Sequence, residues 1–252
     1  MTHDPAAMAS TAMASSATAP VRSVTRTSTT GLPRLLLGSW LLMLASAPAL
    51  AIEPLDMEYQ AKYLGLQANA SMTLTSESAN VWKYSLSIGS NGVQLNQSTT
   101  FEDVKGVWRP LSGTDSSLLL IKKVNTSATY DWKNGVATWS GDVKPEKAGP
   151  VKLQAGDVDA LLLNLVIARD VNAGKPLNYR MVDDGRAKQL SYKVAGKESI
   201  TIGGKTTEAT KVVQEDGKKQ IILWVVKGVA VPVRILQRKD GDDEIDLQLK
   251  SL

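Results

Sequence analysis

The chain has 252 residues and no cysteine, carries a formal net charge of +4, and its single histidine, His3, lies in the N-terminal stretch. The rest of the chain therefore cannot form a Ser-His-Asp or Cys-His catalytic group, a thiolate or imidazole metal site, or a lipid-bearing cysteine. Positive and negative residues are interspersed, which argues against a nucleic-acid-binding face.

The first 31 residues are low in complexity. They contain Ala, Ser and Thr clusters such as "MASTAMASSATA" and too little apolar bulk to fold. We interpret them either as a long leader or as the product of a start codon set too far upstream. In both cases they are removed together with the segment that follows.

That segment has the features of a signal peptide. Arg34 precedes an apolar run from Leu35 to Ala45, and the triplet Ala49-Leu50-Ala51 is typical of a cleavage site before Ile52. The run is shorter than the roughly 20 residues that span a bilayer, so an uncleaved anchor is the less favoured alternative. No twin-arginine pair precedes the run, so we expect general secretory export. This predicts removal of residues 1–51 and a single periplasmic domain of residues 52–252.

The mature part begins with the turn pattern of an antiparallel β protein. In "YSLSIGSNGVQLNQS", Asn91-Gly92 separates two alternating segments. A two-residue turn there would place Ile88 opposite Leu95. This segment is therefore predicted to be a β-hairpin.

A second hairpin is predicted in "ATYDWKNGVATWS". A type I′ turn at Asn134-Gly135 would place Tyr130 opposite Trp139 and Trp132 opposite Ala137, with the aromatic rings on one face. Two more hairpins are expected to turn at Gly203-Gly204 and at Asp216-Gly217. Further strand-like runs are "MTLTSES", "SLLLIKKV", "LSYKVAG", "VPVRILQR" and "EIDLQLKSL". In total the pattern predicts about a dozen strands at a spacing of roughly 10 residues, as in a sandwich or barrel.

The end of the chain indicates a sheet with one wet face and open edges. Three apolar residues, Ile245, Leu247 and Leu249, alternate with polar residues over 244–250. Pro232 cannot donate to a strand ladder, so "VAVPVRI" is expected to begin at a sheet edge or a bulge. We therefore expect two sheet edges or one opening rather than a sealed barrel.

One segment, "GDVDALLLNLVIARD", predicts a helix over about residues 157–171. Asp157 is the expected N-cap, Asp159 lies in the first turn, Arg169 lies in the last turn, and "AGKP" supplies the stop. Apolar residues occupy almost the whole circumference, which is typical of a buried helix. A curved antiparallel sheet wrapped around the helix would bury it on all sides.

A narrow strip of the helix is small or polar: Ala160, Asn164 and Ala168, with Asp157. One interpretation is close packing, in which the alanines let the helix approach the sheet and Asn164 bonds a backbone group. The other interpretation is that the strip lines the mouth of a ligand cavity. The sequence leaves both open.

Three carboxylate groups remain as candidates for chemistry. Asp157 and Asp159 are most simply a helix cap and a dipole partner, and Asp183-Asp184 a turn in "VDDGRAK". The run from Asp240 to Asp246 lacks the spacing of a calcium loop and is most simply a solvated turn. No segment indicates a phosphate loop, a dinucleotide site or a nucleophile elbow. A carboxylate-based hydrolase remains a remote alternative, because no acid and base with distinct surroundings can be nominated.

Most tryptophans lie in or beside apolar alternation and are expected to pack in the core or on a sheet face. Trp108-Arg109 is a possible exception, since an arginine beside an aromatic ring at a strand end can present a planar binding surface. Glu198, beside a hairpin, is most simply a solvated cross-strand partner.

The order of features resembles an exported bacterial family of domain of unknown function 3108. The resemblance covers about residues 56–250 and includes "MEYQAKYLGLQANASMTL", "GVWRPLSG" and "GDVDALLLNLVIARDVNAGKPL". Its most specific motifs are Gly156-Asp157, Gly196-x-Glu198, and Trp224 followed by Val231-Pro232-Val233. The resemblance implies periplasmic export and antiparallel β structure, and it implies no catalytic residue.

We therefore expect a mainly β fold: a strongly curved antiparallel sheet or incomplete barrel around one buried helix. The leading hypothesis is a non-enzymatic carrier for an apolar or amphipathic cell-envelope ligand, without cofactor, metal or stable membrane insertion. The alternative is a structural or interaction protein of the envelope that pairs with a partner protein through a sheet edge. An outer-membrane barrel is disfavoured, because a single Phe101 and a charged closing strand suit aromatic girdles poorly. The ligand, the partner and the oligomeric state stay open.

Overall fold

The computed structural model describes residues 52–63, 65–90, 93–119 and 122–252. All of these belong to one compact unit, Pro48–Leu252. The expected leader and signal peptide lie outside the described residues, and so does the expected turn at Asn91-Gly92.

Thirteen strands of the described part form one antiparallel sheet that does not close. In spatial order they are β11 (Lys193–Ile202), β12 (Lys205–Asp216), β13 (Lys219–Val225), β14 (Arg234–Lys239), β15 (Asp242–Leu249), β1 (Leu55–Tyr63), β2 (Leu66–Ser76), β3 (Val81–Ser90), β4 (Val93–Val104), β5 (Val107–Leu119), β6 (Lys122–Asp131), β7 (Val136–Gly141) and β8 (Val151–Lys152). Because β1 pairs with β15, the first and last strands lie in the middle of the sheet and its edges are β11 and β8.

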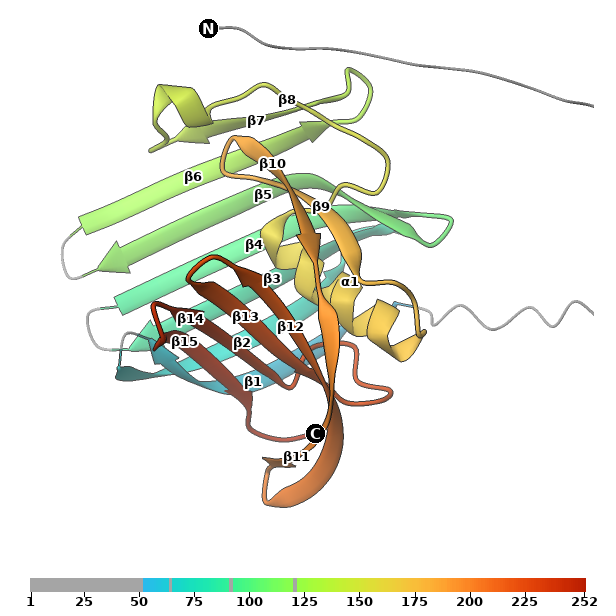
Figure 1. The fold of residues 1–252 in the computed structure, drawn as a ribbon. Coiled ribbons are helices and arrows are strands. Elements are labelled where there is room, and N and C mark those ends of the chain that lie inside the picture. The colour runs from blue at the N-terminus through green and yellow to red at the C-terminus, as the bar shows by residue number, and fades with distance from the viewer. Residues whose placement is uncertain (1–51, 64, 91–92, 120–121) are drawn as a thin grey trace, which may run out of the picture. The chain divides into compact units, whose positions relative to one another are not determined.

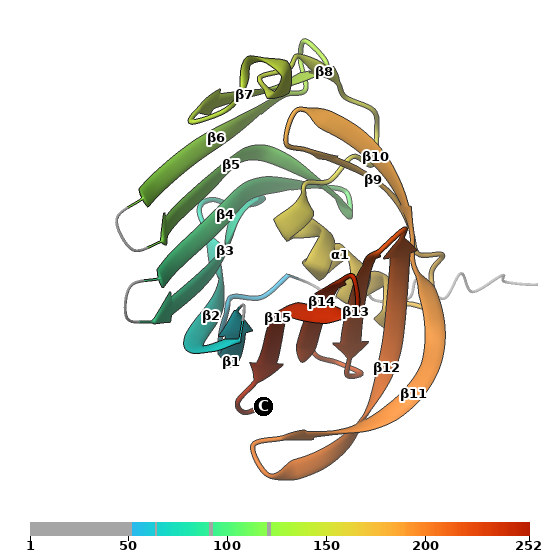
Figure 2. The same ribbon diagram turned by 60° about the vertical axis from the view of Figure 1, so that its left-hand side comes forward.

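Three smaller elements complete the described part. Strands β9 (Asn178–Asp183) and β10 (Arg186–Ser191) form a separate hairpin, η1 (Pro145–Lys147) is a short 3-10 helix, and α1 (Ala160–Asn172) is the α-helix. The sheet curves strongly, and α1 lies on its concave side (Figures 1 and 2). The predicted fold class, a curved open sheet around one helix, is confirmed.

Several hairpins have the expected register. Ile88 lies opposite Leu95 in the β3–β4 pair, and Ile202 opposite Lys205 across Gly203-Gly204. The β9–β10 turn at Asp184-Gly185 has positive φ at both residues, 51° and 73°, which is the type I′ conformation that matches strand twist.

The predicted type I′ turn at Asn134-Gly135 is wrong. Tyr130 pairs with Ala137, not Trp139, so four residues connect β6 to β7 instead of two. The Asp131 carboxylate accepts hydrogen bonds from both the backbone and the side-chain nitrogen of Asn134, at 2.9 and 2.6 Å, and this stabilises the longer loop. Tyr130 and Trp139 still share a face, with ring centroids 6.2 Å apart.

Four further local expectations also need correction. The run "LSYKVAG" is not one strand, because β10 ends at Ser191 and β11 begins at Lys193 in a different sheet. The β12–β13 turn lies at Gly217-Lys218, one residue later than expected, because Asp216 pairs with Lys219. The run "SLLLIKKV" is not one strand, since β5 ends and β6 begins within it; an apolar run does not reveal where its chain reverses. Pro232 stands just before β14, which is a central strand, so it needs neither an edge nor a bulge within the ladder.

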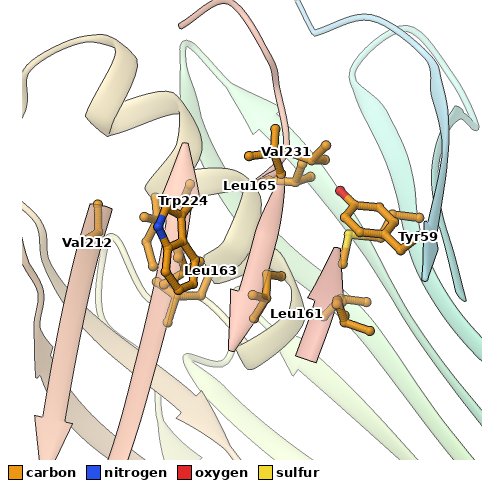
Figure 3. Packing of buried hydrophobic residues seen from close by; sticks show 14 of the residues in the cluster. Tyr59, Leu161, Leu163, Leu165, Val212, Trp224 and Val231 are labelled. Carbon is orange, nitrogen blue, oxygen red and sulfur yellow. The ribbon is translucent and has the colours of Figure 1, made fainter. Parts of the chain in front are cut away.

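The helix begins three residues later than expected. Its N-cap is Asp159, whose carboxylate accepts a hydrogen bond from the Leu162 backbone at 2.7 Å, and Asp157 precedes the cap. Most of α1 is buried, as its apolar circumference predicted. Figure 3 shows leucines of α1 packed between Trp224 of β13 and Tyr59 of β1.

The helix core should be sensitive to the loss of a single methyl group. Ile167 of α1 is fully buried, so Ile167→Val is expected to lower the free energy of unfolding by about 1 kcal/mol, through lost burial and a residual cavity. Leu66→Ala, at a side chain that is 56% exposed, is the control and should change it by less than about 0.5 kcal/mol. Urea unfolding followed by tryptophan fluorescence measures both. Equal effects would contradict tight packing around α1.

Candidate cavity between the helix and the sheet

A cavity of about 330 Å³ lies between the first turns of α1 and the concave face of the sheet. Its apolar wall is formed by residues of β3, β4, β6, β14 and β15: Leu86, Ile88, Leu95, Val124, Ile235, Ile245 and Leu247. Strand alternation turns these side chains inward, and four of them, Leu86, Leu95, Val124 and Ile245, keep partial solvent access. Such a concave, apolar, partly accessible volume lies at the lower end of the ligand-pocket range.

One side of the cavity is polar and acidic. Asp115 of β5 lines it, and a small adjoining hollow of about 30 Å³ is lined by Asp115, Asp159 and Asp183. The two volumes share four lining residues, Gln97, Asp115, Thr126 and Ala160. Among the described residues that line either volume, none is a lysine or an arginine.

The chain path explains why three aspartates from distant segments meet. The segment before α1 runs beside β9, where the Val158 backbone donates to Arg180 and accepts from Val182. This brings Asp159 close to the end of β9, where Asp183 lies. Asp159 is almost fully buried, caps α1 and accepts a 2.6 Å hydrogen bond from the Thr99 hydroxyl of β4.

The three carboxyl groups hold their protons more tightly than usual. Burial is the main cause in each case, and it raises the pKa of Asp159 to about 7 and that of Asp183 to about 6. The pKa of Asp115 is also raised, by partial desolvation and then by the charge of Asp184, although its side chain keeps solvent access. None of the three forms a salt bridge with a described basic residue.

The helix strip predicted from the sequence is divided by the structure. Ala160 and Asn164 lie in the cavity wall, whereas Ala168 is fully buried in the core. Ala160, Asn164 and Ala168 lie along one side of α1, but only the N-terminal part of this strip faces the cavity. Ala168 therefore has the packing role, and the other two have the cavity position.

Trp108 and Arg109 lie away from the cavity and are engaged by other side chains. The Trp108 ring packs 4.5 Å from the Arg169 guanidinium and donates from Nε1 to Asp103 at 3.2 Å. Arg109 forms a 2.6 Å ion pair with Glu102. The planar surface that the sequence suggested is therefore occupied by neighbouring side chains of the same chain.

Glu198 of edge strand β11 is an exposed cross-strand partner. It accepts hydrogen bonds from Lys211 Nζ and Trp224 Nε1, both at 2.8 Å, and these bonds lower its pKa. The Glu198 side chain of the Gly196-x-Glu198 motif is therefore engaged by neighbouring side chains of the same chain.

Two of the other candidate carboxylates, Asp157 and Asp246, form buried ion pairs. Asp157 is buried and forms an ion pair with Arg180, and Asp246, expected on a solvated turn, is buried in a bidentate pair with Arg234 at 2.8 Å. Among the described residues, no three carboxylate or imidazole side chains lie close enough together to hold a metal ion.

Sequence reasoning missed most of the cavity. Asp115 and Gln97 belong to strands in which polar residues are predicted to face solvent, and no local pattern marks these two as inward-facing. The apolar lining residues are typical of core strands, so only the curvature of the sheet reveals that they surround open space.

The fold and the cavity define a class: an open, curved antiparallel sheet that encloses one helix and leaves a ligand-sized space between them. The chain belongs to the family described as "Protein of unknown function (DUF3108)", whose model matches residues 58–248. This confirms the family resemblance read from the sequence motifs. No curated protein matches the chain.

Two solved structures are similar. A beta-barrel-like protein of domain of unknown function DUF1849 from Brucella abortus has 11% identity and a TM-score of 0.46, over 79% of this chain and 96% of that chain. MucB has 7% identity and a TM-score of 0.29, over 79% of this chain and 52% of that chain. Both TM-scores are below 0.5, so neither likeness carries a functional argument.

The described part contains one α-helix, α1, of 13 residues, and it is too short to cross a membrane.

Proposed function

We propose that the mature protein is a non-enzymatic periplasmic carrier that holds an apolar or amphipathic ligand of the cell envelope in the cavity beside α1. The observation that supports this is the cavity itself, in which seven apolar side chains line about 330 Å³ of space. A concave, partly accessible volume lined mainly by apolar side chains is typical of a ligand pocket. The apolar wall favours a hydrocarbon chain, and the polar side at Asp115 favours a polar head group.

The export that we expect from the sequence would fit the same proposal. The signal-like segment before Ile52 predicts that the cysteine-free mature chain is periplasmic. In that compartment, lipids and lipid-linked molecules need a protein that shields their hydrocarbon chains from water. We therefore place the proposed ligand among envelope amphiphiles and assign the chain no reaction, cofactor or metal.

Native mass spectrometry of residues 52–252, purified from the periplasm without detergent, tests the proposal. The expected result is a mass excess that disappears on denaturation and can then be identified. A bare protein mass, together with no uptake of a fluorescent acyl probe by delipidated protein, would overturn the carrier proposal.

A cavity-filling substitution should abolish binding. Val124→Trp places a large ring in the cavity from β6, so we expect uptake of a fluorescent acyl probe to fall at least tenfold. Val107→Trp, at a 51% exposed position on β5 outside the cavity lining, is the matched control and should bind like the parent. Equal binding by both variants, with unchanged circular dichroism, would show that the acyl chain lies elsewhere.

The alternative, a partner protein paired through a sheet edge, has one supporting feature. Edge strand β11 is exposed along most of its length, and Val194 on it is 59% exposed. The irregular register between Val194 and Gly196 weakens this support, because natural edges use such bulges to avoid pairing. Envelope cross-linking should recover one dominant partner, and recovery that persists after Val194→Pro would contradict edge pairing.

A further inference from the structure

The cavity lining is apolar on one side and acidic on the other, and this difference limits the class of ligand that the cavity can bind. Apolar side chains of β3, β4, β14 and β15 form one side, and the other side leads to three aspartates. None of these carboxyl groups forms a salt bridge with a described basic residue, although the charge of Arg186 acts on Asp183 through space and lowers its pKa. Once these carboxyl groups are ionised, above about pH 7, a cationic occupant would balance their charge.

A metal ion suits this end poorly. Divalent ions need several oxygen ligands converging on one point, and the described residues contain no such group of three. Asp159 is also already engaged, with one oxygen on the Leu162 backbone and the other on Thr99. The negative charge of the ionised aspartates is better matched by a cation that contacts one carboxylate directly and is attracted by the others at longer range.

A primary ammonium group meets these conditions. It is small enough for the junction between the large cavity and the 30 Å³ hollow, and its three N–H donors suit the acceptor oxygens of Asp115, Gln97 and Thr126, which line both volumes. The hydrocarbon part of the same molecule would extend along Leu95 and Ile245.

We infer that the cavity selects a cationic amphiphile, with a hydrocarbon chain on the apolar wall and a primary ammonium head at Asp115. This inference rests on the proposed carrier function and adds the charge of the head group. Anionic amphiphiles of the same chain length are expected to bind more weakly, because the ionised aspartates repel them.

The test compares three ligands with one chain and different heads: decylamine, decanol and decanoate. Isothermal titration with the mature protein at pH 8, below micelle-forming concentrations, should give decylamine an affinity about tenfold above decanol, because a partly screened ion pair adds roughly that much. Decanoate should bind more weakly than decanol.

Asp115→Asn removes the charge at the junction and keeps the side-chain shape. The preference for decylamine over decanol should fall about fivefold. Glu244→Gln on β15 is the matched control, since it removes the same charge from a residue that lines neither volume, and it should keep the full preference.

The outcomes separate the two proposals. Binding of all three ligands with equal affinity, or a preference that survives Asp115→Asn, overturns the cationic head and leaves the carrier function standing. Binding of none of the three overturns both. Loss of decanol binding in Asp115→Asn would also count against the inference, because the aspartate would then shape the cavity rather than select charge.

Discussion

Arg180→Met is expected to lower the free energy of unfolding by about 3 to 5 kcal/mol. The Arg180 guanidinium of β9 pairs with Asp157, whose side chain is 1% exposed, and it also donates to the Lys152 backbone oxygen at 3.2 Å. Methionine keeps the packing volume but leaves a buried carboxylate without its counter-charge. Urea unfolding of the parent and the variant at neutral pH measures the loss.

The reciprocal change identifies the cause. Adding Asp157→Asn to Arg180→Met removes the uncompensated charge and keeps an oxygen that accepts from the Gln154 backbone, so most of the lost stability should return. A double variant as unstable as Arg180→Met alone would show that the arginine acts through packing or its backbone contact instead of through the ion pair.

Asp159→Asn is expected to stabilise the protein above neutral pH. Burial raises the pKa of Asp159 to about 7 in the folded protein, against an ordinary value of 3.8. The folded state thus binds this proton more tightly than the unfolded state. The resulting stability is fully present below about pH 4 and is lost as the pH rises through about 7.

Asparagine does not titrate and still offers an oxygen to the Leu162 backbone, so the helix cap remains. Relative to the parent, the variant should gain about 4 kcal/mol between pH 4 and pH 8, since each unit of pKa shift corresponds to about 1.4 kcal/mol. Urea unfolding across this range measures it. Asp240→Asn, on the exposed β14–β15 turn, is the control and should follow the parent curve. Parallel curves for Asp159→Asn and the parent would contradict the raised pKa.

Helix α1 illustrates how much of the fold follows from local pattern. A run that is apolar around its whole circumference must be surrounded, and in a chain of predicted strands only a curved sheet can surround it. The cap was misplaced by two residues because Asp157 and Asp159 are equally good N-caps in sequence. Burial beside Arg180 assigns Asp157 to an ion pair and leaves Asp159 for the cap.

The hairpins also include features that the local sequence predicts and features that tertiary contacts decide. Glycine pairs such as Gly203-Gly204 predict their turns, because positive φ is locally encoded. At Asn134-Gly135 the same signal misleads, since Asp131 bonds Asn134 and selects a longer loop. Register there depends on a side-chain contact that a turn motif does not contain.

The sequence by itself determined the family, the antiparallel β class, the buried helix and the absence of thiol and imidazole chemistry after His3, because periodicity, turn residues and composition are local properties. Only the tertiary structure decided that Ala160 and Asn164 face open space while Ala168 does not, and that Asp115, Asp159 and Asp183 meet. These facts depend on the curvature of thirteen strands and on the path of the segment before α1 along β9, both of which arise from contacts between residues far apart in the chain.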